Sequence, residues 1–341
     1  MKTLLVCSLT SFTLLAGLLP ASAQETTLNL SISATDTAAA VSASFAAQAS
    51  PSFAGNASGA SLSISIGGAL SAPGDEIGAI PPPGFYPGDL SNPLNHPTVV
   101  SAQQHDIYLN CAPTCWGTPA NFLADLDESD FIHITDQYVG TSANHRYTLG
   151  GAGSFTGTVP HILPLTTLVA MAHTAAAVYG TGLNHIYHFY LPPGQDICLN
   201  PTSCYSPDNF STFVFCAFHS FINFGSFGQV LLTVEPFQNV PGCTVQAPSP
   251  NGLLIDSTAT FLSHELFETI TDPLLNAWFN RVSLDLRGAE IGDECQNRTF
   301  GYGSVSINHK KYEVQPEYSN AVHGCAFSPS LRPDEGDGGG N

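Results

Sequence analysis

Positive charge is scarce in this chain. Its 341 residues include 8 lysines and arginines against 27 aspartates and glutamates, a formal net charge of −19 at pH 7. A surface this acidic repels the phosphates of nucleic acids and the anionic head groups of membranes. We therefore expect neither nucleic acid nor membrane among the partners of this protein.

Several signatures of common enzyme classes are also missing. The chain has no G-x-S-x-G elbow of the kind that presents a serine nucleophile. Its glycine-rich stretch "GGAGSFTG" has no lysine to bind a phosphate. No C-x-x-C pair suggests a thiolate metal site, and no segment beyond residue 23 is long and apolar enough to cross a bilayer. These absences argue against serine hydrolases, P-loop proteins and thiolate zinc proteins.

The N-terminus, "MKTLLVCSLTSFTLLAGLLPASAQ", has the pattern of a secretory signal. Lys2 supplies the positive start, an apolar stretch follows, and small residues precede Gln24. A membrane anchor is disfavoured because serine and threonine interrupt the apolar stretch. We predict a signal peptide at 1–23 and an extracellular, monomeric mature protein.

Cysteine usage agrees with export. After Cys7 is lost with the signal, eight cysteines remain, and an even number in an exported chain indicates disulfides. Eight cysteines allow 105 pairings, and spacing alone does not choose among them. Pairing nearest neighbours is one of these arrangements, and it would join Cys111 to Cys115, Cys198 to Cys204, Cys216 to Cys243 and Cys295 to Cys325.

The chain divides by composition. Residues 24–97 lack cysteine and are rich in alanine, serine, glycine and proline, which indicates a leader or linker in which "TLNLSIS" and "SLSISI" are candidate strands. A spacer is favoured over a propeptide that blocks a site. In residues 98–328, helical and strand patterns alternate, which predicts an α/β or α+β domain with a mixed sheet flanked by helices and stapled by disulfides. Residues 329–341 are predicted to be a disordered tail.

One helix carries most of the chemistry. The segment "STATFLSHELFETITDP" has Asp256 or Ser257 as a natural N-cap, and Pro273 predicts an end near Thr271. His264 and Glu268 are four residues apart, so both project from one face of the helix.

That spacing resembles a known zinc motif. In H-E-x-x-H helices two histidines bind zinc, and the intervening glutamate takes a proton from water. Here Glu265 holds the place of that general base, and Glu268 stands where the second histidine would be. A carboxylate also binds zinc, although its charge weakens the Lewis acidity of the ion. The alternative is that His264 and both glutamates lie on the solvent side of a core-packing helix.

A third metal ligand is expected downstream. The stretch "AEIGDECQN" places Glu290 and Asp293 close to Cys295, so a disulfide could hold this acidic loop against the helix. We predict His264 and Glu268 as ligands and Glu290 or Asp293 as the third. His219 in "CAFHSF" is the next candidate ligand or transition-state donor, against a buried, hydrogen-bonded role.

Calcium is the alternative to zinc, because it prefers oxygen ligands. The chain offers four carboxylates for it: Glu268, Asp272, Glu290 and Asp293.

Three segments of the sequence resemble a known family. They read "SHELFETITDPLLNAWFN", "AEIGDECQN" and "YEVQPEYSNAVHGCAF". They are similar to the C-terminal half of the phosphate-induced protein 1 (EXORDIUM-like) family, and closer to secreted bacterial proteins with an H-E-L-x-E-x-x-T-D-P helix and an E-I-G-D-x-C loop. With "YHFYLPPGQDIC" and "FCAFHS", the resemblance covers roughly residues 98–327. It matches His264, Glu265 and Glu268 to the helix, and Glu290, Asp293 and Cys295 to the loop.

The resemblance implies an extracellular protein with a zincin-like helix and peptidase activity. Two hypotheses follow. The first is a secreted zinc peptidase or related hydrolase that acts on a peptide, cell-wall or other extracellular substrate. The second is a non-catalytic extracellular binding or signalling protein that holds a structural calcium ion or no metal.

Overall fold

The computed structural model describes the backbone of residues 28–31, 41–45 and 61–64, and residues 86, 88–245, 249–283, 286–296 and 303–330 in full. The predicted signal peptide, most of the predicted leader and almost all of the predicted tail lie outside the described residues. Among the described residues, no helix has the length and apolar character needed to cross a membrane.

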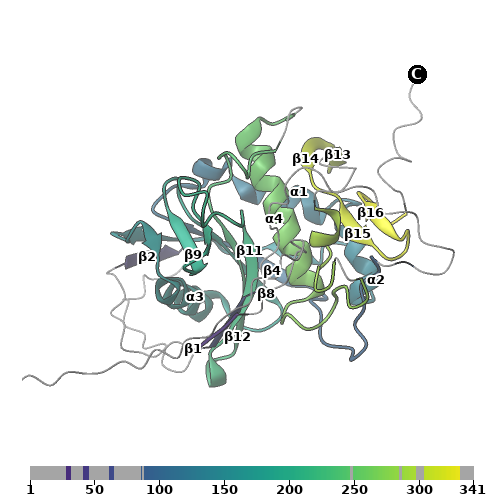
Figure 1. Cartoon of the computed structure of the whole chain (residues 1–341), viewed down its shortest axis with the longest axis horizontal. Helices are drawn as coiled ribbons and strands as arrows, with labels where there is room; N and C mark the ends of the chain where they lie inside the picture. The colour runs from purple at the N-terminus through teal and green to yellow at the C-terminus, as the bar shows by residue number, and fades with distance from the viewer. Residues whose placement is uncertain are drawn as a thin grey trace, which may run out of the picture.

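A nine-stranded mixed sheet forms the centre of the molecule (Figure 1). Its strand order is β1-β3-β11-β12-β8-β4-β6-β2, with β5 beside β4. Strands β12, β8, β4 and β6 run parallel, whereas β11 is antiparallel to both of its neighbours, β3 and β12. The strands are β1 (Leu28–Ser31), β2 (Val41–Phe45), β3 (Ser61–Ile64), β4 (Ala102–Leu109), β5 (Tyr147–Leu149), β6 (Gly153–Gly157), β8 (His185–Tyr190), β11 (Phe218–Asn223) and β12 (Gln229–Glu235).

Helices cover both faces of this sheet, so the predicted mixed sheet flanked by helices is confirmed (Figure 1). The helices are α1 (Pro119–Asp127), α2 (Asp136–Val139), α3 (Leu165–Tyr179) and α4 (Leu253–Thr271). Smaller sheets contain β7 (Ile162–Leu163), β9 (Asp196–Asn200) and β10 (Ser203–Tyr205), then β13 (Gly303–Ile307) with β14 (Lys310–Val314), and β15 (Glu317–Ser319) with β16 (Gly324–Ala326). Short 3-10 turns are η1 (Pro113–Trp116), η2 (Ile132–Thr135), η3 (Gly225–Phe227) and η4 (Asp293–Cys295).

Side chains that alternate between the two faces of the sheet contribute to two separate hydrophobic cores. On β8, Tyr187 and Phe189 face the core that contains α3, whereas Ile186 and Tyr190 face the core that contains α4. Successive side chains of a strand point to opposite faces, so a central strand buried on both faces must be apolar or hydrogen-bonded throughout. This arrangement leaves α4 between the sheet on one side and β14 with α1 on the other.

Strands from the alanine- and serine-rich segment form both edges of the large sheet. The predicted strands in "TLNLSIS" and "SLSISI" correspond to β1 and β3, and β3 pairs with β11. Strand β2, which the sequence did not indicate, pairs with β6 at the other edge. The domain boundary at residue 97 stays a prediction.

All four nearest-neighbour disulfides are present, which confirms that pairing: Cys111–Cys115, Cys198–Cys204, Cys216–Cys243 and Cys295–Cys325.

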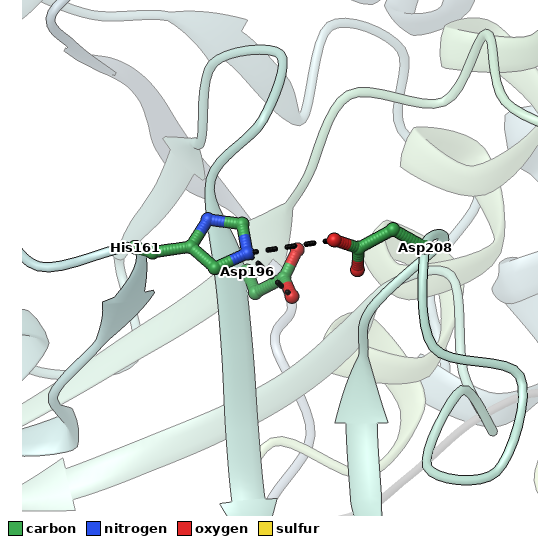
Figure 2. Close-up of side chains that lie close together, drawn as sticks. All are labelled: His161, Asp196 and Asp208. Atoms are coloured by element: carbon green, nitrogen blue, oxygen red, sulfur yellow. Dashed lines mark ion pairs between the residues drawn. The ribbon is translucent and has the colours of Figure 1, made fainter.

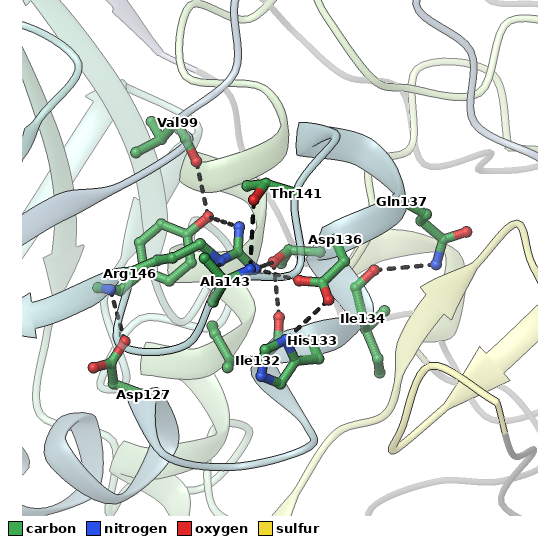
Figure 3. Close-up of polar contacts among 12 residues, drawn as sticks. Val99, Asp127, Ile132, His133, Ile134, Asp136, Gln137, Thr141, Ala143 and Arg146 are labelled. Carbon is green, nitrogen blue, oxygen red and sulfur yellow. Dashed lines mark hydrogen bonds and ion pairs between the residues drawn. The ribbon is translucent and has the colours of Figure 1, made fainter.

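A buried arginine organises the segment that packs beside α4 (Figure 3). Arg146 forms an ion pair with Asp136, and its Nε donates to the carbonyl of Ala143 at 2.9 Å. Its Nη1 lies 3.1 Å from the hydroxyl of Tyr147, which donates to the carbonyl of Val99 at 2.8 Å. Because a buried charge needs a partner, these contacts fix η2 and α2, which both contact α4.

The α4 face of the sheet also buries a carboxyl group. Asp106 on β4 accepts hydrogen bonds from Tyr108 at 3.1 Å and from Tyr190 at 3.0 Å. Burial raises the pKa of Asp106 from 3.8 to about 6, although the two hydroxyls oppose this rise. The charge of Asp106 in turn contributes, after burial and Glu265, to the raised pKa of Glu235.

Asp106→Asn is therefore expected to remove part of the pH dependence of stability. Between pH 3.8 and about 6, the folded Asp106 keeps a proton that the unfolded chain releases, so this residue lowers stability as pH rises. From pH 4 to pH 7 the loss is about 2 kcal/mol, and neutral asparagine avoids it. Urea unfolding at both pH values would measure the difference. Parallel pH profiles for the two proteins would contradict the assigned pKa.

Candidate metal centre

The helix that carries His264 ends at Thr271, as predicted, but starts earlier than predicted. Its N-cap is Gly252, with φ of 88°, and not Asp256 or Ser257. The carboxylate of Asp256 instead accepts hydrogen bonds from Asn251 N at 2.9 Å and Ser249 Oγ at 2.8 Å. Asp256 therefore holds the preceding loop against the first turn, which extends the helix toward its N-terminus.

The histidine and both glutamates of α4 are buried. His264 is 2% exposed, and Glu265 and Glu268 are 0% exposed. The alternative that these side chains lie on the solvent side of the helix is wrong, because β11, β12 and β14 pack against α4. Burying ionised groups without partners is unfavourable, so they need neighbouring charges, protons or a metal ion.

His219, on β11, lies at the centre of these groups. Its Nδ1 is 3.1 Å from Glu268 Oε2 and 3.6 Å from Glu265 Oε2, and its Nε2 is 3.4 Å from Glu290 Oε2. His264 Nε2 is 3.1 Å from the other oxygen of Glu268, Oε1. Glu268 thus has one carboxylate oxygen beside each imidazole.

The predicted acidic loop reaches the helix. Glu290 is fully buried, and Asp293 Oδ1 is 3.9 Å from His264 Nε2. Gln315 Nε2 donates to the carbonyl of Gly292 at 2.6 Å and lies 3.1 Å from His264 Nδ1. A side chain at Gly292 would place its Cβ 2.4 Å from His264 Nδ1, so only glycine lets the loop approach this closely.

Two residues of the centre gave little sequence signal. The sequence indicates His219 only as a further candidate ligand, and no motif in the sequence indicates Glu317 on β15. Both carboxylate oxygens of Glu317 lack a hydrogen bond within the described part of the chain, and its electrostatic neighbours include His264. Asp272, one of the candidate calcium ligands, instead accepts hydrogen bonds from Asn276 N and Ala277 N, both at 2.6 Å.

Burial and neighbouring charges shift the pKa values of the two glutamates of α4 in opposite directions. Burial alone raises the pKa of Glu268, but His264 and His219 outweigh it and lower that pKa to about 2. For Glu265, burial dominates and the pKa is raised. Glu268 is therefore a permanent anion suited to metal binding, whereas Glu265 is suited to accept and return a proton.

The imidazoles respond in the opposite sense. Burial lowers the pKa of His219, but Glu265 and Glu268 outweigh it and raise that pKa to about 10. The pKa of His264 is raised for the same reason, with Glu268 as the main opposing charge. In the absence of a metal ion, these two imidazolium groups supply the positive charge that the buried carboxylates need.

The distances between donor atoms fit a transition-metal ion. Two groups each bring three potential ligand atoms within 4.8 Å of one another: His219, Glu268 and Glu290, and His264, Glu265 and Glu268. Atoms about 2.1 Å from a tetrahedral zinc ion lie about 3.4 Å apart, close to the separations observed here. Within the described residues, neither His219 Nε2 nor His264 Nε2 makes a hydrogen bond. Each group contains one imidazole, which favours zinc over calcium, because calcium prefers oxygen ligands.

Comparisons with known proteins add no assignment. No protein-family model, curated protein or solved structure matches this chain. The resemblance to the phosphate-induced protein 1 family therefore stays a prediction.

Proposed function

We propose that this protein is a secreted, zinc-dependent hydrolase whose active helix is α4, with a peptide or cell-wall polymer as substrate. The observation that carries the proposal is the convergence of His219, His264 and Glu268, with Glu290 beside them, from three separate parts of the fold. A glutamate with a raised pKa, Glu265, lies at the same point. Four disulfides are consistent with an oxidising, extracellular setting.

Each residue has a role in this proposal. Glu268, which belongs to both groups, would hold the ion either with His219 and Glu290 or with His264. When bound, zinc would act as a Lewis acid on the scissile carbonyl and lower the pKa of water. Glu265 would take a proton from the attacking water and transfer it to the leaving group.

Glu265→Gln tests this role directly. The amide keeps the shape of the side chain but cannot take a proton, so hydrolysis of casein or a fluorogenic peptide library should fall about 10²- to 10⁴-fold. Bound zinc, measured by elemental analysis, should remain.

Glu313→Gln is the matched control, because Glu313 is a buried glutamate on β14 whose carboxylate accepts a hydrogen bond from Ser304 at 2.7 Å. Full activity of Glu265→Gln would exclude Glu265 as the base. Wild-type protein that hydrolyses nothing and holds no zinc would overturn the whole proposal.

Burial favours a second candidate, in which the same residues hold a structural ion in a non-catalytic extracellular binding or signalling protein. His219, Glu265 and Glu290 are all 0% exposed, so a substrate can reach Glu265 only after a covering segment moves. Zinc that raises the melting temperature of a protein without hydrolytic activity would favour this candidate over the enzyme. Stabilisation by calcium alone would point to the oxygen ligands instead.

A further inference from the structure

A second group of potential ligands lies at the surface, on elements that contribute nothing to the centre on α4 (Figure 2). His161 immediately precedes β7, Asp196 begins β9, and Asp208 lies in the loop after β10. His161 Nε2 is 3.4 Å from Asp196 Oδ2 and 3.7 Å from Asp208 Oδ2. Figure 2 shows the imidazole nitrogen directed at both carboxylates.

The orientation of the imidazole is set by a backbone carbonyl. His161 Nδ1 is 3.0 Å from the carbonyl oxygen of Gly194. A carbonyl oxygen only accepts hydrogen bonds, so Nδ1 carries the hydrogen and the neutral ring has its lone pair on Nε2. Metal-binding histidines typically have this second contact, which fixes the tautomer and the ring direction. Here the lone pair points at two anions, an arrangement suited to holding a cation between them.

Asp196 is the buried member of the group. The residue is only 5% exposed, yet among the described residues its carboxylate accepts no hydrogen bond, and its ion-pair partner is His161. Burial raises the pKa of Asp196, with the charge of Asp208 acting in the same direction and His161 in the opposite one. A buried carboxylate normally has hydrogen-bond donors around it. The carboxylate of Asp196 instead lies beside His161 and close to the carboxylate of Asp208.

The backbone around the group is held in place. Asp196 N donates to the carbonyl of His161 at 2.9 Å, and the buried amide of Gln195 donates to the same carbonyl at 2.6 Å. Strands β7 and β9 pair with Ile162 opposite Asp196, and the Cys198–Cys204 disulfide joins β9 to β10. Hydrogen bonds therefore hold the backbone at two of the three ligand residues, His161 and Asp196.

We propose that His161 Nε2, Asp196 and Asp208 form a second site for a divalent transition-metal cation of the zinc class, with water in the remaining positions. One imidazole and two carboxylates form a ligand set that zinc accepts, and the imidazole disfavours calcium. The bound cation would join the turn before β7 to the loop after β10. This site does not depend on the centre on α4 or on hydrolysis.

Zinc titration of the full chain after chelator treatment tests the proposal. His161 and Asp208 are 58% and 71% exposed at their side chains, so His161→Gln and Asp208→Asn should fold normally. Each is expected to weaken one zinc-binding event by about tenfold or more in isothermal titration calorimetry. Elemental analysis after gel filtration should show one zinc fewer per chain than in the wild type.

Two further variants separate this site from its alternatives. His145→Gln is the matched control, because exposed His145 lies 3.7 Å from the single carboxylate of Asp127 and should keep the wild-type zinc content. Glu268→Gln should remove only the zinc held at α4. Zinc binding at the surface site can therefore be measured even if the centre on α4 binds none, and the reverse also holds. If His161→Gln and Asp208→Asn bind as much zinc as the wild type, the surface site is refuted.

Discussion

Replacing His219 with glutamine is expected to cost about 3–5 kcal/mol of folding stability in the presence of a chelator. His219 is fully buried and faces three carboxylates, from Glu265, Glu268 and Glu290. Its raised pKa, about 10, means that the imidazole is positively charged at neutral pH. Glutamine leaves those buried carboxylates without that charge, which costs more than the loss of a neutral hydrogen bond. Urea unfolding at pH 7 would measure the change.

His188→Gln is a matched control for this prediction. His188, on β8, is equally buried and faces the same core, but its partners are the neutral side chains of Thr233, at 2.9 Å, and Gln104, at 3.0 Å. Burial lowers the pKa of His188 to about 3, so this imidazole is neutral. Its loss should cost about 1–3 kcal/mol. Equal costs for the two variants would mean that His219 carries no charge in the folded protein.

Removing the Cys295–Cys325 disulfide is expected to affect both stability and metal binding. The bond closes a loop with a sequence separation of 30, so the Cys295→Ser/Cys325→Ser variant should lose about 3–4 kcal/mol through the greater freedom of its unfolded chain. Cys295 ends η4, the turn that contains Asp293 and follows Glu290. The zinc equivalent that depends on Glu268 should bind about tenfold or more weakly, because the acidic loop is no longer anchored.

The Cys111–Cys115 disulfide provides the comparison. Its sequence separation is 4, so the corresponding double serine variant should lose only about 2 kcal/mol and should bind zinc like the wild type. Denaturant unfolding and zinc titration under non-reducing conditions would measure both properties. Unchanged zinc affinity in the Cys295→Ser/Cys325→Ser variant would show that packing alone, without the disulfide, positions the acidic loop.

Parts of the candidate centre could be predicted because they depend on neighbouring residues. The spacing of His264 and Glu268 places both on one helical face wherever the helix packs. Pro273 is incompatible with helical geometry at the residue before it, and the helix ends at Thr271. Cys295 lies within five residues of Glu290, so a disulfide there must restrain the acidic loop.

Other parts could not be predicted from local patterns. His219 is 49 residues from Glu268 along the chain, and the antiparallel pairing of β11 with β12 sets the face toward which its side chain points. A one-residue change of register would turn His219 to the opposite face of the sheet. Charged residues on a helix ordinarily indicate a solvent-exposed side, yet α4 is covered on both sides.

The sequence by itself determined the mixed α/β composition, the helix that carries His264 and Glu268, and the end of that helix, because short-range sterics and helical spacing control these features. Only the tertiary structure decided that His219 joins them, that Glu265 and Glu268 are buried with opposite pKa shifts, and that His161, Asp196 and Asp208 meet at the surface. Those outcomes depend on strand register and layer packing, which bring distant side chains together and remove water from their charges. Local sequence patterns do not indicate which strand register or layer packing a chain adopts.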